Sequence, residues 1–416
     1  MFLSNNKIKI FLLIIFTIKL TIYANTIIGL DQKAYTSYIE SLSNSFSFKE
    51  TSGHYYAKDP KGYYLLSALV FKVFNRINYG IESLRILSVV LGIISMFYIF
   101  KSIDLLTNKK NTRFIAYMLA VFHPTLATNM AKISPDVLLI FSSVIIIYFL
   151  IKYFDYKSLN IKNNLILGIF LGIGLLSKQQ FIGFIPFIIV YFLIRARINK
   201  LIYKEFNNLI FILFIALLIS SWSFIINYYN YGNLQYGRGV NSENIPKISL
   251  NSSIKFIEFL YTDFFIMKNN IVHHFGNFGI QQIYINKIFY FTFSIIYIIS
   301  FIIFLLHVLT QKINSKKYLY FLLISLILIN FLGIMYADYV YKYSSDGIRL
   351  VRSGLFNHLI IIEVIIISIG LTNLTQKKNL DWINSVVSFI FAAFLIITDL
   401  IIIIYYNLPV YALGVF

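Results

Sequence analysis

Residues 135–153, which read PDVLLIFSSVIIIYFLIKY, decide the fold class of this chain. The run has only two charged residues, Asp136 near its start and Lys152 near its end. An α-helix rises about 1.5 Å per residue, so a run of this length crosses most of the ~30 Å hydrocarbon core of a bilayer. Because the apolar residues are continuous and do not alternate with polar ones, the run predicts a transmembrane helix and not a strand of a membrane barrel.

Similar apolar runs occur along the whole chain and define about eleven predicted transmembrane helices. They cover residues 8–28, 83–106, 113–131, 135–153, 164–178, 180–196, 207–226, 287–309, 318–337, 350–372 and 383–406. A shorter apolar stretch, residues 63–74, includes Lys72 and is followed by Arg76. It predicts an interfacial or re-entrant helix. The predicted fold is therefore an all-α polytopic membrane protein.

The composition supports this fold class. Of 416 residues, 58% are hydrophobic and 13% are charged, which excludes both a soluble globular protein and a disordered one. The net charge of +19 would suggest a nucleic-acid partner in a soluble protein, but the basic residues form no long cluster, so none is expected. The absence of cysteine excludes disulfides and thiol catalysis.

The loop charges predict the orientation of the helices. Threading the chain with its N-terminus inside, as a retained signal anchor, places about fifteen Lys and Arg residues in five short inner loops, against about four in three short outer loops. The four outer residues are Lys132, Lys178, Lys342 and Arg349. The active side would then face the exterior or periplasm of a cytoplasmic (inner) membrane.

Two long segments fall on the outer side in this threading and divide the chain. We expect an N-terminal transmembrane module at 1–226 that contains the first outer loop at 29–80, a second outer segment at 227–286, and C-terminal transmembrane helices at 287–416. Residues 256–265 of the second segment have the pattern of an amphipathic helix that lies on the membrane surface. Membrane lipids are therefore expected partners.

Asp31 is the first residue with potential chemistry. It follows the first predicted helix directly, at the outer membrane surface, where a carboxylate is partly desolvated and still accessible to a hydroxyl-bearing acceptor. Tyr35 would share its helical face. An aspartate that caps a helix N-terminus is the alternative interpretation.

The same loop continues with Lys58, Asp59, Pro60 and Lys61. Two lysines that flank an Asp-Pro turn, just before interfacial tyrosines, are suited to holding a lipid phosphate at headgroup depth. A solvated loop next to an aromatic belt is the alternative.

Two further outer positions carry charge. Asp136 lies at the N-terminus of its predicted helix, where a carboxylate is favourable without any function. Lys178 lies in a turn of a few residues between two apolar helices, where an anion would explain it, although snorkelling of the side chain to the membrane surface would also do so.

In this order, these segments resemble the C-type glycosyltransferase superfamily, in particular the relatives of protein O-mannosyltransferases, aminoarabinose transferase and lipopolysaccharide-core transferases. The resemblance covers residues 8–200 and includes Asp31 with Tyr35, the segment 58–66, the segment 82–88 with Arg85, and Asp136 and Lys178.

The resemblance implies an inverting hexosyl- or pentosyltransferase that uses a polyprenyl-phosphate-linked sugar and an envelope glycan, lipid or protein acceptor. Asp31 would be the general base, and Lys58, Lys61 and Lys178 would bind the donor phosphate. Asp136 would orient a lysine or the acceptor. Tyr35, Asp59 and Arg85 would contact substrate.

The later part of the chain adds less specific candidates for substrate contacts, namely Arg238, His273, His274, Arg349 and Arg352. The adjacent histidines mark no metal site, because neighbouring side chains diverge and no third ligand is indicated. No cofactor is firmly implied, and a divalent metal requirement stays open.

Two other functions compete with the enzyme. A transporter or flippase of lipid-linked sugars would place ionisable residues along a path through the membrane, and Glu363 within the tenth predicted helix favours it. An envelope polysaccharide polymerase or ligase would carry its main loop late in the chain. The ionisable residues otherwise gather at the outer ends of the helices, so the enzyme is the leading hypothesis.

Overall fold

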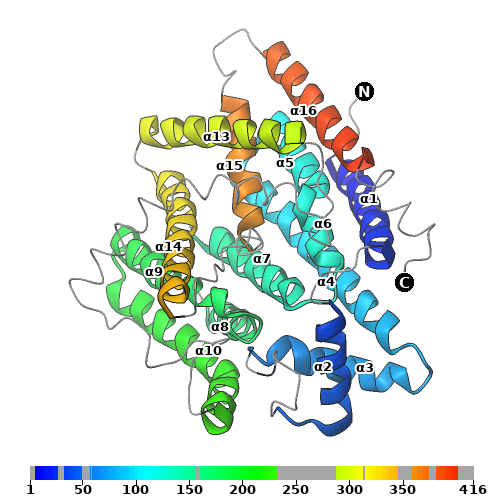
Figure 1. Cartoon of the computed structure of the whole chain (residues 1–416). Coiled ribbons are helices and arrows are strands. Elements are labelled where there is room, and N and C mark those ends of the chain that lie inside the picture. The colour runs from blue at the N-terminus through cyan, green and yellow to red at the C-terminus, as the bar shows by residue number, and fades with distance from the viewer. Residues whose placement is uncertain are drawn as a thin grey trace.

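The computed structural model describes residues 5–26, 32–48, 57, 59–154, 160–231, 287–312, 314–344, 358–373 and 381–401. The regular elements of this part of the chain are helices (Figure 1). They are α1 (Asn5–Thr26), α2 (Gln32–Ser45), α3 (Gly62–Asn75), α4 (Gly80–Leu106), α5 (Lys110–Phe122), α6 (Pro124–Ala131), α7 (Pro135–Tyr153), α8 (Ile161–Leu175), the 3₁₀ helix η2 (Gln179–Gly183), α9 (Phe184–Asn199), α10 (Ile202–Tyr231), α13 (Lys287–Thr310), α14 (Ser315–Ser344), α15 (Ile360–Asn373) and α16 (Asp381–Ile401).

The all-α membrane fold is confirmed. Six described helices are long and apolar enough to cross a bilayer, and the bent pair α5–α6 would be a seventh. Four shorter apolar stretches, at 161–175, 294–310, 360–373 and 389–400, fall in the remaining predicted windows. The protein is a multi-pass membrane protein. The number of crossings and their orientation stay predictions, and the predicted amphipathic helix at 256–265 lies outside the described residues.

One predicted span is not a continuous helix. Residues 113–131 form α5 and α6, which are bent by 46° relative to each other. Pro124 has no N–H to continue the helical ladder, and His123 adopts an extended conformation. The Nδ1 atom of His123 accepts a hydrogen bond from the backbone N–H of Thr125 at 3.3 Å, which caps the new helix.

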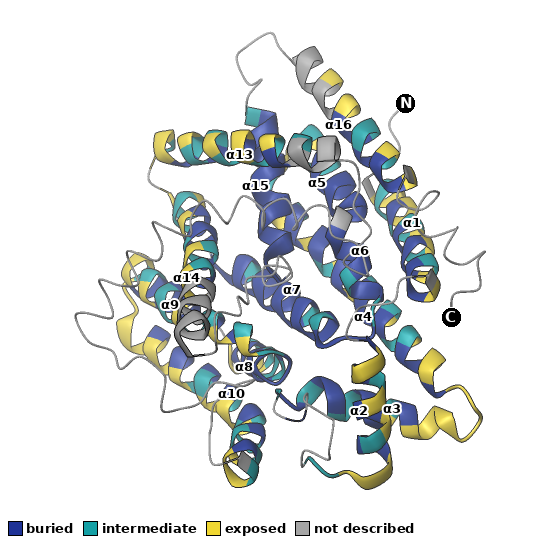
Figure 2. Cartoon of the chain, viewed as in Figure 1, coloured by how far each residue is buried: buried dark blue, intermediate teal, exposed yellow. Residues whose placement is uncertain are grey.

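The buried core is centred on α7 and α15, which other helices surround. Figure 2 shows both helices almost entirely buried, whereas α10, α13 and α16 carry exposed faces. Large apolar side chains occupy the exposed face of α10, namely Ile210, Phe214, Leu217, Leu218 and Ile225. An apolar face of this size is unfavourable in water, and it indicates a surface that contacts lipid.

Glycines allow α8 and α10 to pack closely. A Cβ atom at Gly168 would lie 2.7 Å from the Cβ of Ile215, and one at Gly172 would lie 2.7 Å from the Cβ of Ile219. Small residues four apart are a common way for membrane helices to approach each other. This packing positions the outer end of α10 next to the end of α8.

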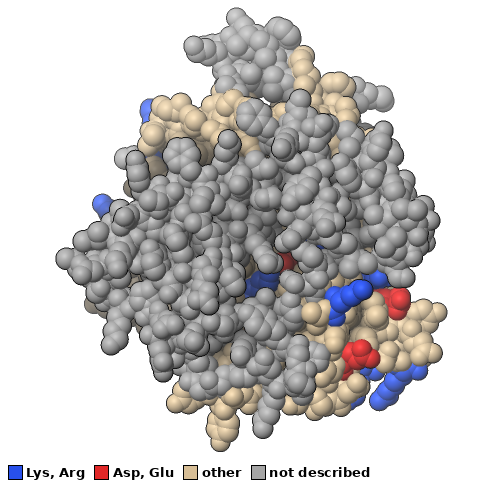
Figure 3. Space-filling model, viewed as in Figure 1, with Lys and Arg blue, Asp and Glu red and all other residues tan. Residues whose placement is uncertain are grey.

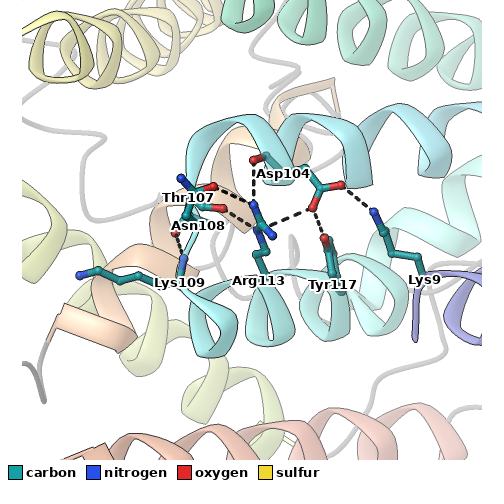
Figure 4. Close-up of polar contacts among 7 residues, drawn as sticks. All are labelled: Lys9, Asp104, Thr107, Asn108, Lys109, Arg113 and Tyr117. Atoms are coloured by element: carbon teal, nitrogen blue, oxygen red, sulfur yellow. Dashed lines mark hydrogen bonds and ion pairs between the residues drawn. The ribbon is translucent and has the colours of Figure 1, made fainter. Parts of the chain in front are cut away.

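Helix ends that the threading places on the inner side meet in the structure. The Asp104 carboxylate at the end of α4 pairs with Lys9 of α1 at 2.8 Å and lies 3.7 Å from Arg113 of α5, and Tyr117 donates a hydrogen bond to it (Figure 4). At the junction of α9 and α10, the fully buried Arg195 and Glu205 pair at 2.8 Å. These contacts fit the predicted alternation of the helices.

Candidate active site

The first outer loop is docked onto the turn that follows α8. The backbone N–H of Gly62 donates to the carbonyl of Leu176 at 2.8 Å. A Cβ atom at Gly62 would lie 2.5 Å from the Cβ of Leu176 and 2.9 Å from its carbonyl oxygen, so this approach requires glycine. The contact brings Lys61 close to the turn that ends in Lys178.

Lys178 and Asp136 form an ion pair across this junction. The Nζ of Lys178 lies 2.7 Å from Oδ1 of Asp136, and the two side chains are 24% and 18% exposed. Pro135 starts α7 and places Asp136 in its first turn, where the helix dipole favours a carboxylate. The pair is partly desolvated and still accessible, a suitable state for a group that meets a charged ligand.

Lys132 adds a second positive charge. It follows α6 directly, and its backbone carbonyl accepts a hydrogen bond from Ser88 at 3.1 Å. Burial lowers its pKa, Asp136 opposes this effect, and the neighbouring Lys178 adds to it. Two lysines therefore lie near one carboxylate, and a bound anion would favour the ammonium form of both lysines. In the sequence alone, Lys132 is one of the four outer-loop charges and bears only on the predicted orientation.

Lys61 is buried, and its ammonium is bound by the protein itself. Its Nζ donates to Oδ1 of Asn227 at 2.6 Å, to the Asp59 carbonyl at 3.0 Å and to the Ala57 carbonyl. Burial lowers the pKa of Lys61 to about 8, and Asp59 partly opposes this shift. An ammonium has three donors, and all three have partners here.

The predicted substrate contacts Tyr35 and Asp59 are held by an aromatic cluster. The ring of Tyr35 lies 6.1 Å from that of Tyr64, and Tyr38 meets the same ring edge-on at 5.0 Å. The Tyr64 hydroxyl donates to Oδ2 of Asp59 at 3.3 Å. These contacts join α2 to α3 and fix the start of the loop, and they place Tyr35 among packed tyrosines.

Arg85 lies near the start of α4. Ser88, three residues on and so on the same helix face, contacts the carbonyl of Lys132. The Nε of Arg85 is buried and has no hydrogen-bond partner within the described part of the chain. The position places a cation on the side of α4 that faces the loop after α6.

Seven predicted site residues lie outside the described residues. They are Asp31, Lys58, Arg238, His273, His274, Arg349 and Arg352.

In Figure 3, basic and acidic side chains lie next to each other in the middle of the face shown, and a second mixed group lies over the end where Figure 1 shows α2 and α3.

Two other ionic groups are buried away from this junction. The Glu363 carboxylate of α15 lies 3.6 Å from Nε2 of His123. Lys19 pairs with Asp399, whose Oδ1 accepts a hydrogen bond from Tyr23 at 3.1 Å. Lys19 of α1 is buried at this contact with α16. Among the described residues, no group of three or more His, Asp or Glu is placed to hold a metal ion.

Comparison with known proteins finds a family model that matches part of the chain and solved structures with a similar fold. Residues 58–224 match the family model of dolichyl-phosphate-mannose-protein mannosyltransferase. The structure is similar to that of ArnT from Cupriavidus metallidurans bound to undecaprenyl phosphate, with a TM-score of 0.55 and 11% identity, over 92% of this chain and 62% of that one. It is also similar to the archaeal oligosaccharyltransferase AglB from Archaeoglobus fulgidus, solved with an inhibitory peptide and a dolichol-phosphate, with a TM-score of 0.50 and 12% identity, over 95% of this chain and 55% of that one.

The match to this family model, over about two fifths of the chain, and the fold shared with ArnT and AglB agree with the predicted resemblance to the C-type glycosyltransferase superfamily. The resemblance deduced from residues 8–200 is thus confirmed at this level. The chain spans less than two thirds of the length of either protein. No curated protein matches the chain in sequence.

Proposed function

We propose that this protein is a membrane glycosyltransferase that takes a sugar from a polyprenyl-phosphate-linked donor. The observation that carries the proposal is the cluster of Lys178, Asp136 and Lys132 next to the docked loop with Lys61. Two lysines beside one carboxylate, at the ends of apolar helices, suit a phosphate whose lipid tail stays in the bilayer.

The proposed reaction is a single displacement. The acceptor hydroxyl oxygen attacks the anomeric carbon of the donor sugar, and the bond from that carbon to the phosphate oxygen breaks. Asp31 takes the hydroxyl proton, and the lipid phosphate leaves with the bonding electron pair. Attack from the opposite side inverts the anomeric centre. The acceptor class is an envelope lipid, glycan or protein.

The charged residues would have different roles in phosphate binding. Lys178, with Lys58 from the loop, would stabilise the charge that develops on the leaving phosphate, and Asp136 would orient Lys178. Because the Lys61 ammonium is saturated by internal acceptors, we assign it to holding the loop next to the phosphate. Further substrate contacts would come from a set of polar residues, Tyr35, Asp59, Arg85, Arg238, His273, His274, Arg349 and Arg352.

The predicted orientation places this junction on the outer side of the cytoplasmic membrane. The helix ends that carry Lys61, Asp136, Lys178 and Asn227 are all outer ends in the threading of the chain. Donor and acceptor would therefore meet at the exterior or periplasmic surface.

The test compares envelope glycolipids and glycoproteins by mass spectrometry in cells that carry the wild type, Asp31→Asn or Glu40→Gln. Asparagine has nearly the shape of aspartate but cannot accept the proton, so we expect transfer to be lost while membrane levels of the protein are unchanged. Glu40 is an exposed carboxylate of the same outer segment and serves as the matched control. Undiminished transfer by Asp31→Asn would exclude this base.

The buried ionic groups give a transporter of lipid-linked sugars some support. Both pairs, Glu363 with His123 and Lys19 with Asp399, lie inside the helix bundle, and one of them flanks the break between α5 and α6. Broken helices with ionisable residues are typical of transporters. Movement of a lipid-linked sugar across vesicles, without a change in the mass of any acceptor, would favour this function over the enzyme.

A further inference from the structure

Asn227 at the outer end of α10 holds the first outer loop. Its Oδ1 accepts a hydrogen bond from the Lys61 ammonium at 2.6 Å, and both side chains are buried. One turn earlier, the Ser223 hydroxyl accepts a bond from the Lys61 backbone N–H at 3.2 Å. Ser223 and Asn227 of α10 thus hold both the backbone N–H and the side-chain ammonium of Lys61.

The same lysine closes the loop on itself. Its ammonium reaches back to the carbonyls of Ala57 and Asp59, so the turn between them is held in one shape. The backbone N–H of the next residue, Gly62, donates a hydrogen bond to the carbonyl of Leu176, which lies two positions before Lys178. Two hydrogen bonds, joined by the backbone from Lys61 to Gly62, therefore connect Asn227 to the turn with Lys178.

A lysine is a costly choice for a purely structural link. All three acceptors of the Lys61 ammonium are neutral, and a buried charge loses several kcal/mol of hydration. Well-packed apolar residues would hold α10 against the loop at least as well. A charge kept at this place despite its cost suggests that an anion lies nearby when the site is occupied.

We propose that Asn227 is a positioning residue of the active site: by binding Lys61 it fixes the first outer loop, and through Gly62 it sets the place of Lys178 relative to the donor phosphate. This inference rests on the proposed function for the identity of the phosphate. The bracing of the loop does not depend on any ligand.

The first measurement therefore uses the full-length protein without ligand. Amide hydrogen exchange at Lys61 and Gly62 is compared in the wild type, Asn227→Leu and Asn230→Leu. Asn230, one turn further along α10, contacts the Phe48 carbonyl at 3.4 Å and is the matched control. We expect exchange at the two amides to be faster by about tenfold or more in Asn227→Leu only. Equal protection in all three proteins would overturn the proposal.

The second measurement is the affinity for undecaprenyl phosphate in nanodiscs between pH 6.5 and 9.5. Because the ammonium form of Lys61 is lost above about pH 8, wild-type affinity should fall there, whereas an exposed lysine would keep its charge to about pH 10.5. Asn227→Asp keeps an acceptor oxygen and adds a negative charge, so the fall should move to higher pH. Asn227→Leu should weaken binding about tenfold, with Asn230→Leu unchanged.

The two measurements separate the two proposals. Hydrogen exchange could show that Asn227 holds the loop while the wild type does not bind undecaprenyl phosphate at any pH. This result would refute the proposed donor, and with it the role of Asn227 in phosphate binding. A wild type that binds, with Asn227→Leu and Asn227→Asp showing the same affinity and the same pH profile, would refute the positioning role and leave the donor in place.

Discussion

The ion pair between Lys178 and Asp136 is the residue contact on which the proposed chemistry depends most. Both side chains are about one fifth exposed, so water screens them less than a surface pair and still reaches them. A phosphate that enters the site would compete with the carboxylate for the ammonium. In the proposed function, Asp136 would therefore keep Lys178 in place before the donor arrives, at the cost of some affinity for the donor.

We predict that Lys178→Met weakens the binding of undecaprenyl phosphate about tenfold or more, since hydrogen bonds to charged groups contribute about 1.5–3 kcal/mol. Lys178→Arg keeps the charge and should retain most of the affinity. Lys33→Met, which removes an exposed lysine of α2, is the control. Binding measured in nanodiscs decides the matter, and a Lys178→Met protein that binds like the wild type contradicts the role of this lysine.

Residue patterns identified some of these groups and missed others. Asp136 and Lys178 are conspicuous in the sequence, because they are charges at the ends of apolar helices. Asn227 is not, because a neutral amide near the end of a span has no such signal. Its partner is 166 positions away, so only the folded chain shows that the two meet.

At the scale of elements, glycine determines how closely α8 and α10 pack. Cβ atoms at Gly168 and Gly172 would meet side chains and carbonyls of α10 at 3.0 Å or less. Between membrane helices there is little hydrophobic driving force, so close van der Waals packing holds this pair together. The pairing in turn carries Ser223 and Asn227 to the loop that they hold.

Gly172→Ala is therefore expected to lower the thermal stability of the purified protein, since the added methyl would lie 2.7 Å from the Ile219 Cβ and 3.0 Å from the Ala216 carbonyl. Gly333→Ala is the matched control, because no atom lies within 4 Å of its added methyl. Alanine favours helix over glycine by up to about 1 kcal/mol, so the control should be unchanged or slightly more stable. Equal melting temperatures for the two variants would contradict this account of the packing.

The break between α5 and α6 shows an element that run length alone does not predict. Residues 113–131 are apolar enough for one span, but Pro124 interrupts the ladder and His123 caps the second half. The freed backbone groups need partners in a membrane. Lys19 of α1 supplies one of them, with its ammonium 3.4 Å from the Val121 carbonyl.

At the scale of the whole molecule, two groups of polar contacts join helix ends that the threading places on the same side. Lys9, Asp104 and Arg113 meet at predicted inner ends, and Lys61, Asp136 and Lys178 lie at predicted outer ends. The alternation of helix directions follows from short connections between consecutive spans. The excess of lysines in the short inner loops predicts which helix ends face the cytoplasm.

Since the chain has no cysteine, single cysteines report the orientation directly. We predict that a membrane-impermeant maleimide labels Arg76→Cys in intact spheroplasts and labels Lys110→Cys only after the membrane is opened. Both positions are exposed, so access to the side chain itself is comparable. The reverse pattern would invert the topology and place the proposed site on the cytoplasmic side.

The sequence by itself determined that this protein is a multi-pass helical membrane protein, because the length and hydrophobicity of a span are local properties of the chain. It also indicated which charged residues are unusual for their positions. Only the tertiary structure decided which of them meet: Lys178 with Asp136 across 42 positions, and Lys61 with Asn227 across 166. The physical reason is that apolar helices of similar composition can pack in many arrangements, and the choice among them depends on close contacts such as those of Gly62 and Gly172.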